Sequence, residues 1–279
     1  MRYERPGQLE QALTLLAHDD WKVLAGGTDF YPALGDRQPT GNILDITAIE
    51  NLTGITCNDD YWRIGARTTW SQIIDADLPP AFDCLKLAAR EVGSIQIQNR
   101  ATLAGNICNA SPAADGVPPL LTLDAEVEIS SATQTRQIPL KDFIRGNRDT
   151  DLQGSELVSA VLVPRSSATG TSSFSKLGSR KYLVISIVMV AVRLASNESD
   201  EITTAAVSVG SCSAVAKRLG ELENALIGKS IYEDLGNVIQ PAHLAQLSPL
   251  DDVRAPATYR LEAVAELLAR TINNARGQG

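Results

Sequence analysis

The amino-acid sequence predicts an α+β protein of two domains, and three observations support this fold class. Short apolar stretches typical of buried strands alternate with stretches whose apolar residues recur at helical spacing. The chain has 279 residues, which is enough for one large or two moderate domains. The stretch Pro164–Ser173 is rich in Ser, Thr, Gly and Pro, as linkers are. We therefore place a domain boundary there and expect domains over residues 1–168 and 169–279.

The first domain is expected to combine one amphipathic helix with several strands and further short helices. Within Gln8–Ala17, the residues Leu9, Leu13 and Leu16 recur at helical spacing, and a short apolar run follows. The expected strands are Trp21–Ala25, Asn42–Ile46, Tyr61–Gly65, Val127–Ser130 and Leu157–Val163, and the further helices are Trp70–Asp75 and Ala81–Val92.

The second domain is expected to be a small α+β unit. Tyr182–Leu194 and Ile202–Val209 have the composition of buried strands. Ala214–Ile227 and Arg260–Ala275 place Leu, Ile and Ala on one face, as amphipathic helices do.

Composition and charge exclude several classes of function. The 33 acidic and 25 basic residues give a net charge of -8, and no cluster of Lys and Arg is present, so we expect no nucleic-acid partner. The four cysteines lie far apart without a CxxC pair, and there are two histidines, so we expect reduced, mostly buried thiols, no metal site and no catalytic residue. The longest apolar stretch, Val184–Val192, is too short to span a membrane, and the N-terminus lacks the apolar core of a signal peptide. These features predict a cytoplasmic protein.

The first segment with the chemistry of a nucleotide site is Val23–Phe30, an apolar strand that runs into paired glycines. Gly26 and Gly27 allow successive main-chain N–H groups to point into one concavity, which is how a loop binds phosphate without lysine. A tight turn without a ligand is the alternative reading of this loop.

The second such segment is the loop Ala101–Asp115, in which small and short polar residues surround Gly105. Two Asn, a Thr and a Ser could bind phosphate, ribose and ring heteroatoms at close range. A polar loop that merely covers the sheet is equally compatible with this composition.

Together, AGGTDF at residues 25–30 and TLAGNICNASPAAD at residues 102–115 resemble the flavin-binding subunit or domain of the xanthine dehydrogenase family of molybdenum hydroxylases. The separate medium subunit of aerobic carbon monoxide dehydrogenase and its relatives is the most similar type. The likeness continues in Gly65–Thr69, Leu123–Ala125, Glu156–Pro164 and Phe174–Arg180, so it covers nearly the whole chain. It implies a PCMH-type FAD-binding domain of two α/β subdomains, followed by a C-terminal domain of the CO dehydrogenase flavoprotein type.

The resemblance also implies which residues contact FAD. Both segments wrap the pyrophosphate in that family, and a hydrophobic residue and a lysine contact the flavin ring. Carried over position by position, the implied FAD-binding residues are Leu24, Ala25, Gly26, Gly27, Thr28, Thr102, Gly105, Asn106, Asn109, Ser111, Asp115, Leu157 and Lys176. Leu157 matches the apolar contact beside the flavin ring, and Lys176 matches the cation at its polar edge. Ala104 stands where the family usually has a second glycine.

The implied function is electron transfer within a molybdenum hydroxylase complex, by non-covalent FAD. The partners implied are a small subunit with [2Fe-2S] clusters and a large subunit with molybdopterin, and the acceptor is NAD+, oxygen or a quinone. Two alternatives remain open at this point: a self-sufficient flavin oxidase or reductase, and a non-enzymatic FAD-binding module. A membrane-spanning segment is not expected.

Overall fold

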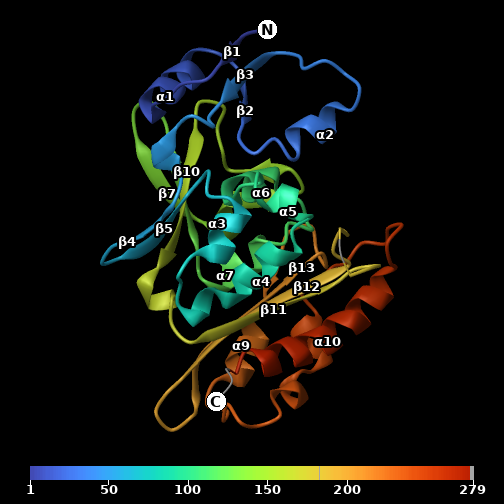
Figure 1. Ribbon diagram of the computed structural model, residues 1–279. Helices are drawn as coiled ribbons and strands as arrows, with labels where there is room; N and C mark the ends of the chain where they lie inside the picture. The colour runs from blue at the N-terminus through green and yellow to red at the C-terminus, as the bar shows by residue number, and fades with distance from the viewer. Residues whose placement is uncertain (182, 277–279) are drawn as a thin grey trace.

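The protein is elongated, with its N-terminus at one end and its C-terminal region at the other (Figure 1). The computed structural model describes residues 1–181 and 183–276. From the N-terminal end, the chain forms a small parallel sheet, a larger antiparallel sheet flanked by helices, and a second antiparallel sheet covered by helices on both faces. This arrangement confirms the predicted α+β class.

The N-terminal sheet is parallel and has three strands in the order β1-β3-β2. Ala12, Leu13 and Leu16 on one face of its helix pack against Leu44 and Ile46, because their helical spacing brings them to one side. The predicted helix and both predicted strands are confirmed, with ends shifted by at most one residue. The elements are β1 (Tyr3–Glu4), α1 (Leu9–His18), β2 (Trp21–Leu24), α2 (Phe30–Leu34), β3 (Asn42–Asp45) and η1 (Glu50–Leu52).

The middle of the molecule is built on an antiparallel sheet of five strands in the order β4-β5-β10-β6-β7. Its core joins strand residues such as Ile64 and Val161 to Leu103, Ile107 and Leu120 from the helices beside it. The elements are β4 (Ile55–Cys57), β5 (Tyr61–Gly65), α3 (Trp70–Asp75), η2 (Pro80–Phe82), α4 (Asp83–Glu91), α5 (Ile95–Gln98), α6 (Leu103–Asn109), α7 (Val117–Thr122), β6 (Glu126–Ser130), β7 (Thr135–Pro139), α8 (Leu140–Phe143), β8 (Ile144–Gly146), β9 (Asp149–Thr150), β10 (Leu157–Pro164) and η3 (Arg165–Ser167).

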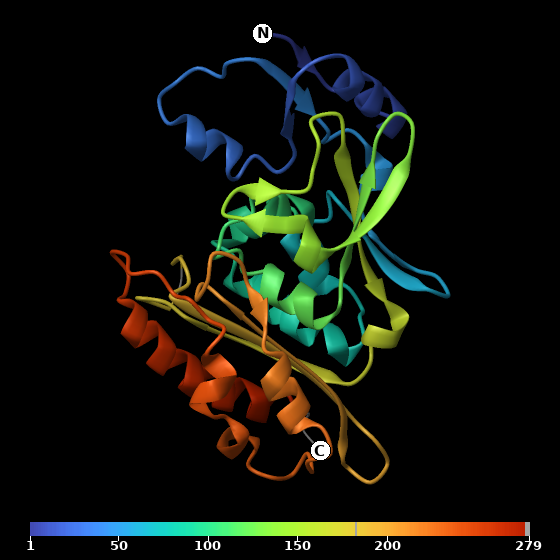
Figure 2. The same ribbon diagram turned by 180° about the vertical axis from the view of Figure 1, so that it is seen from behind.

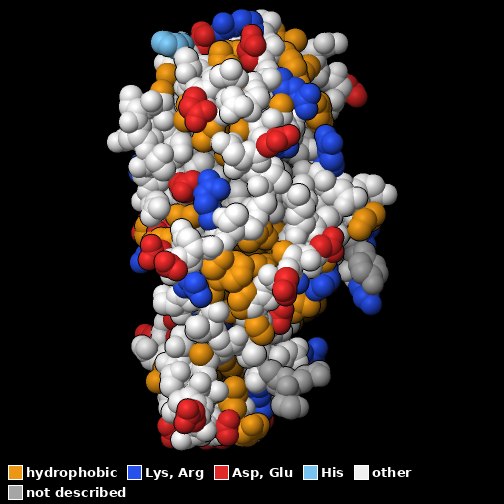
Figure 3. Space-filling view, turned by 60° about the vertical axis from the view of Figure 1, so that its left-hand side comes forward, with side chains coloured by type: hydrophobic (Ala, Val, Ile, Leu, Met, Phe, Trp, Pro, Cys, Tyr) orange, Lys and Arg blue, Asp and Glu red, His pale blue; other side chains and the backbone are white. Residues whose placement is uncertain are grey.

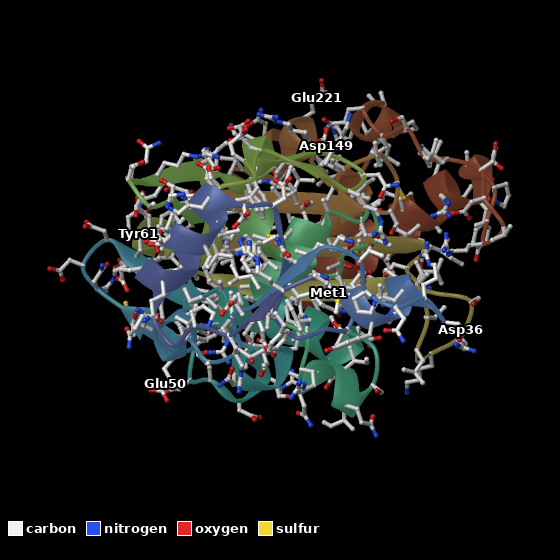
Figure 4. All side chains as sticks on the ribbon, turned by 90° about the horizontal axis from the view of Figure 1, so that it is seen from above. Met1, Asp36, Glu50, Tyr61, Asp149 and Glu221 are labelled. Atoms are coloured by element: carbon white, nitrogen blue, oxygen red, sulfur yellow. The ribbon has the colours of Figure 1, made fainter. Side chains whose placement is uncertain are left out.

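Most predicted elements of this region are confirmed. Helix α3 has the predicted bounds because Thr69 forms a capping box with Gln72 immediately before it. The predicted helix Ala81–Val92 is a tight 3-10 turn followed by α4, since the prolines at its start favour the tighter turn. Seen from above, Asp36 in the loop after α2 and Tyr61 in β5 project on opposite sides of the molecule (Figure 4).

The C-terminal domain is an antiparallel sheet in the order β11-β12-β13-β14, with α9 and α10 on its outer face (Figure 2). Even-numbered residues of β12, such as Val190 and Val192, pack toward the core that contains Leu268 of α10. Odd-numbered residues, Met189 and Ala191, pack on the opposite face. The elements are β11 (Thr171–Leu177), β12 (Val188–Ser196), β13 (Ile202–Gly210), β14 (Lys217–Arg218), α9 (Gly220–Leu226), η4 (Leu235–Val238), η5 (Pro241–Leu244) and α10 (Ala257–Asn274).

Three expectations for this half of the chain need correction. The predicted linker ends early, because Thr171–Ser173 already belong to β11. Ser172 is buried there; its Oγ accepts a hydrogen bond from Cys84 N and donates one to Ala81 O. The strand predicted over Tyr182–Leu194 begins at Val188, and residue 182 lies outside the described residues. The predicted helix Ala214–Ile227 is divided, since Lys217–Arg218 pair with β13 and only Gly220–Leu226 is helical.

The two halves of the protein share a buried boundary between α4 and the sheet of the C-terminal domain. Cys84 and Ala88 of α4 pack against Phe174, Met189 and Ala191. A second contact lies at the end of α7.

At that contact Arg193 of β12 donates to Thr122 O at 2.8 Å and to Thr169 O at 3.4 Å. Arg193 is 2% exposed, and both it and Arg218 form ion pairs with Asp124. Polar and apolar contacts therefore fix the C-terminal domain on the middle region.

Charges of both signs are mixed on the face drawn in Figure 3, and two of the four cysteines are buried, where most were expected to be. On the face drawn in Figure 3, basic side chains are interspersed with acidic ones, and apolar side chains gather near the middle. Among the described residues, no helix is long and apolar enough to cross a membrane. All four cysteines are free thiols; Cys84 and Cys212 are buried, Cys108 is partly buried and Cys57 is exposed.

Candidate functional site

A cleft of about 510 Å³ lies where the N-terminal sheet meets the middle region. It is within the usual size of small-molecule sites. Val23 of β2 and Ile46, just after β3, border the cleft, so it opens at the carboxyl ends of two parallel strands. That edge is where open parallel sheets usually bind ligands.

The first glycine loop forms one wall of the cleft. A Cβ atom at Gly26 would lie 2.0 Å from Arg100 O, so this loop touches the backbone of the second segment and only glycine fits. Gly27 has φ +76°, a conformation that favours glycine.

The loop also presents free hydrogen-bond donors. Within residues 1–181 and 183–276, the main-chain N–H groups of Gly26, Gly27 and Thr28 have no protein acceptor. All three residues line the cleft. This arrangement provides the donors that the sequence predicted for a phosphate-binding loop.

The second segment is a helix where a loop was expected. Leu103–Asn109 form α6, and Thr102 is its N-cap, with Oγ1 accepting from Gly105 N at 3.1 Å. The expectation of a loop was wrong. Asn and Gly are common in loops, but Thr102 caps the first turn and stabilises a helix here. One edge of the helix lines the cleft through Ala104, Gly105, Asn106 and Asn109.

Much of the remaining lining of the cleft is apolar. It includes Ala66, Val92, Ile97, Leu152 and Leu157. Leu157 is 4% exposed and opens β10, the central strand of the five-stranded sheet. A planar ring would find apolar contact here.

Glu156, next to Leu157, is bound in a cluster of charged groups. Arg136 donates to its two carboxylate oxygens from Nε and Nη2, each at 2.8 Å, and Gln153 N donates at 3.0 Å. The hydrogen bonds from Arg136 lower the pKa of Glu156 below its ordinary value, although burial opposes the shift. These contacts fix the start of the strand that lines the cleft.

We expect Glu156→Gln to reduce stability at neutral pH and to matter progressively less in acid. A carboxyl group whose folded pKa is lowered stabilises the fold above its unfolded pKa, about 4.5, and this contribution is lost as the pH falls through the folded pKa. Urea unfolding of both proteins between about pH 7 and about pH 3 measures the difference. If the difference in free energy of unfolding between the two proteins stays constant over this range, the pKa of Glu156 is not lowered in the folded state.

Nine of the thirteen predicted site residues line the cleft. They come from three separate parts of the chain that the fold brings together. These residues are Ala25, Gly26, Gly27, Thr28, Thr102, Gly105, Asn106, Asn109 and Leu157.

The other four lie outside the lining. Leu24 is buried in β2, and its carbonyl accepts from Ile46 N. Ser111 accepts from Ala113 N at 3.2 Å and so closes its own turn. Asp115 and Lys176 form an ion pair with each other, with Lys176 Nζ 2.7 Å from Asp115 Oδ2.

This ion pair is nearly closed to solvent. The side chain of Lys176 is 5% exposed and that of Asp115 is 9% exposed. Ser186 Oγ donates to the second carboxylate oxygen of Asp115 at 2.6 Å. Burial raises the pKa of Asp115, whereas the Lys176 ammonium and the Ser186 hydroxyl act in the opposite direction.

Sequence reasoning missed several residues that line the cleft. Apolar residues such as Val92, Ile97 and Leu152 carry no local signal, since only the tertiary fold brings them to the cleft. Asp29 and Phe30 follow the first loop directly and could have been included on that ground. Cys108 lines the cleft as well, one turn into α6.

The lining fits FAD chemically. Free main-chain N–H groups at Gly26, Gly27 and Thr28 suit a pyrophosphate, and the wall around Leu157 suits a ring. The described lining contains no Lys or Arg, so the donors for an anion are main-chain groups. Among the described residues, no group of three or more His, Cys, Asp or Glu side chains could hold a metal ion.

Comparison with protein families gives two matches that together cover most of the chain. Residues 1–166 match the FAD binding domain in molybdopterin dehydrogenase. Residues 173–275 match the CO dehydrogenase flavoprotein C-terminal domain.

Similar proteins are medium or FAD subunits. The chain is 31% identical to the glyceraldehyde dehydrogenase medium chain of Sulfolobus acidocaldarius, over 95% of this chain and 94% of that one. It is 30% identical to the nicotinate dehydrogenase FAD-subunit of Eubacterium barkeri, over 87% of this chain and 83% of that one.

A solved structure of carbon monoxide dehydrogenase from Hydrogenophaga pseudoflava contains a chain with the same fold. The TM-score is 0.89 at 25% identity, over 100% of this chain and 98% of that chain. The predicted resemblance is thereby confirmed. The glycine loop, the capped helix and the two family matches lead to one assignment: this chain belongs to the FAD-binding medium subunits of the molybdopterin dehydrogenase family of oxidoreductases.

Proposed function

We propose that this chain is the electron-transferring FAD subunit of a molybdenum hydroxylase complex. Electrons would pass from molybdopterin on a large partner subunit to [2Fe-2S] clusters on a small partner subunit, and from these clusters to FAD on this chain. They would leave to an acceptor such as NAD+, oxygen or a quinone. When bound, FAD supplies the uptake and release of electrons, singly or in pairs, while the protein binds and orients it.

The observation that carries this proposal is the set of free N–H groups at Gly26, Gly27 and Thr28. We assign to these groups, with Thr102, Gly105 and Asn106, the binding of the pyrophosphate. Leu157 would pack beside the ring. The domains proposed over 1–168 and 169–279 are supported by the two family matches, which end and begin on either side of this boundary.

The test is a visible absorption spectrum of the purified chain, with mass analysis of any released ligand and a reductive titration with NADH. A yellow protein that releases intact FAD and reacts slowly with small organic substrates supports a subunit that depends on partners. Rapid turnover of a small substrate by the chain alone would favour a self-sufficient flavin enzyme. A protein that stays colourless after incubation with FAD would overturn the proposal.

Cys108 provides a chemical probe of the same cleft. Burial raises the pKa of its thiol to about 12, so it is protonated at neutral pH and reacts slowly. We expect FAD to slow its alkylation further, since the thiol lines the cleft. The measurement is mass-spectrometric labelling in a Cys57→Ser background, which removes the exposed thiol. Equal labelling rates with and without saturating FAD would place the cofactor elsewhere.

A further inference from the structure

The tip of the hairpin formed by β8 and β9 is attached to the helix that lines the cleft. Asn147 and Arg148 link Gly146 to Asp149, which pair across the two strands. The main-chain N–H of Arg148 donates to Ala110 O at 3.0 Å, and Ala110 is the C-cap of α6. Because Ala110 is 1% exposed, this contact fixes the hairpin tip against a buried helix end.

The Arg148 side chain extends from this tip to the end of the glycine loop. Its Nη2 lies 3.7 Å from Oδ1 of Asp29, which directly follows Thr28 and lines the cleft. The side chains of Arg148 and Asp29 are 63% and 53% exposed, so the pair lies at the rim of the cleft. A separation of 3.7 Å is too long for a hydrogen bond, and within the described part of the chain the guanidinium has no hydrogen-bond acceptor.

Arg148 also occupies a backbone conformation that favours glycine. Its φ is +57°, a left-handed value at which a Cβ atom crowds the backbone. Glycine would adopt this conformation without strain and would still donate its main-chain N–H. Residues other than glycine that are held in this region are often found at ligand-binding sites. The geometry of the hairpin therefore gives no reason for an arginine at this position.

The charges beside the glycine loop have opposite effects on an anion bound there. The Asp29 carboxylate lies one residue beyond the free N–H groups of the loop and repels phosphate. The described lining of the cleft contains no Lys or Arg, and Arg148 is the cation that pairs with Asp29 from outside this lining. Arg148 therefore offsets a charge that would oppose binding of a pyrophosphate.

We propose that Arg148 is a specificity-determining residue, which favours the anionic pyrophosphate of FAD by offsetting the charge of Asp29 and attracting the phosphates across the rim of the cleft. The proposal rests on FAD binding with its pyrophosphate at the glycine loop. It adds a charge to the main-chain donors, from a hairpin outside both predicted segments. Coulomb attraction of this kind acts without direct contact and falls as the ionic strength rises.

The first experiment measures the FAD Kd of Arg148→Met, Asp29→Asn and the double variant at low salt. We expect Arg148→Met to weaken binding about fivefold, as for one charge a few ångströms away in water, and Asp29→Asn to strengthen it. The double variant should bind about as well as the wild type. An ion pair that only supports the hairpin would instead make both single variants bind more weakly, which would overturn the proposal. Arg270→Met, which removes an exposed arginine from α10, should leave the Kd unchanged.

The second experiment separates the need for the charge from the need for the side chain in the hairpin. We expect Arg148→Gly to unfold at the same temperature as the wild type or higher, because the backbone strain is released. Its FAD Kd should still rise about fivefold, as in Arg148→Met. Arg148→Lys keeps the charge and should retain most of the affinity. If Arg148→Gly loses stability and FAD affinity together, Arg148 is a structural residue and the proposal is wrong.

Ionic strength and the reduction potential identify the part of FAD that responds to these charges. Between about 0.01 M and about 1 M salt the Debye length falls from about 30 Å to about 3 Å, so the differences in Kd should disappear. The flavin potential should be equal in the wild type, Arg148→Met and Asp29→Asn, because the pyrophosphate is not the redox group. Potentials that shift in opposite directions in the two variants would place the charges beside the ring and refute the proposal.

Failure of this proposal can be distinguished from failure of the proposed function. Wild-type protein that binds no FAD would refute the proposed function itself. If the wild type binds FAD and the Kd is unchanged in Arg148→Met and Arg148→Gly, only the role of Arg148 is refuted.

Discussion

Gly27→Val is expected to abolish FAD retention. Valine is disfavoured at the φ of +76° found here, and its Cβ would lie 2.7 Å from the ring of Tyr31. Tyr31 is exposed and can yield, but the strained φ shifts the loop backbone, so its N–H groups would turn away from the pyrophosphate that we propose they bind. The loss of two donors to a charged group corresponds to about 3 kcal/mol or more, a reduction in affinity of about 100-fold. The measurement is the ratio of FAD to protein after gel filtration.

Gly41→Val is the matched control. Gly41 has φ +83°, so valine is strained there too, but no atom lies within 4 Å of its Cβ position and the residue does not line the cleft. This variant should lose some stability and keep its FAD. Full FAD occupancy in Gly27→Val would refute the assignment of the glycine loop.

Arg193→Met is expected to destabilise the protein by about 3 kcal/mol, the largest effect on stability that we predict. The guanidinium is 2% exposed, and its removal leaves Thr122 O and Thr169 O without their buried donor. Asp124 loses one of its two arginine partners. The measurement is the midpoint of urea unfolding.

Arg270→Met serves as the control for losing an arginine. Arg270 pairs with Glu266 one turn away on α10, and its side chain is 68% exposed. Exposed pairs of this kind contribute about 0.5 kcal/mol or less. If the midpoint of urea unfolding falls equally in the two variants, the buried contacts of Arg193 do not stabilise the protein more than an exposed ion pair does.

The local elements could be predicted from the sequence where a single segment contains the whole signal. Helix α3 has the bounds that the sequence predicted, and in the structure Thr69 caps it immediately before Trp70. The glycine loop was recognised as a candidate because paired glycines let main-chain N–H groups point into one concavity, and the resemblance of AGGTDF to the family then favoured a phosphate site over a plain turn. Val188–Val192 is a continuous apolar run, which by itself predicts a buried strand, and it lies in β12.

What could not be predicted depends on contacts between distant parts of the chain. Ser172 has the composition of a linker residue, but it pairs with Arg193 of β12, and its hydroxyl bonds with residues about 90 positions earlier. The ion pair between Lys176 and Asp115 joins residues 61 positions apart, so it is invisible to local patterns. Leu152, Val92 and Ile97 became site residues only when the fold brought them to one cleft.

The alternation along β12 has a consequence for synthesis of the chain. Met189 and Ala191, with Phe174 of β11, form the cover of Cys84 and Ala88 on α4. Residues 1–168 are synthesised before this cover, so α4 lacks its partners on this side for the time needed to add about 20 more residues, which is seconds at ordinary rates of elongation. A chain of residues 1–168 would therefore expose this apolar side of α4 to solvent.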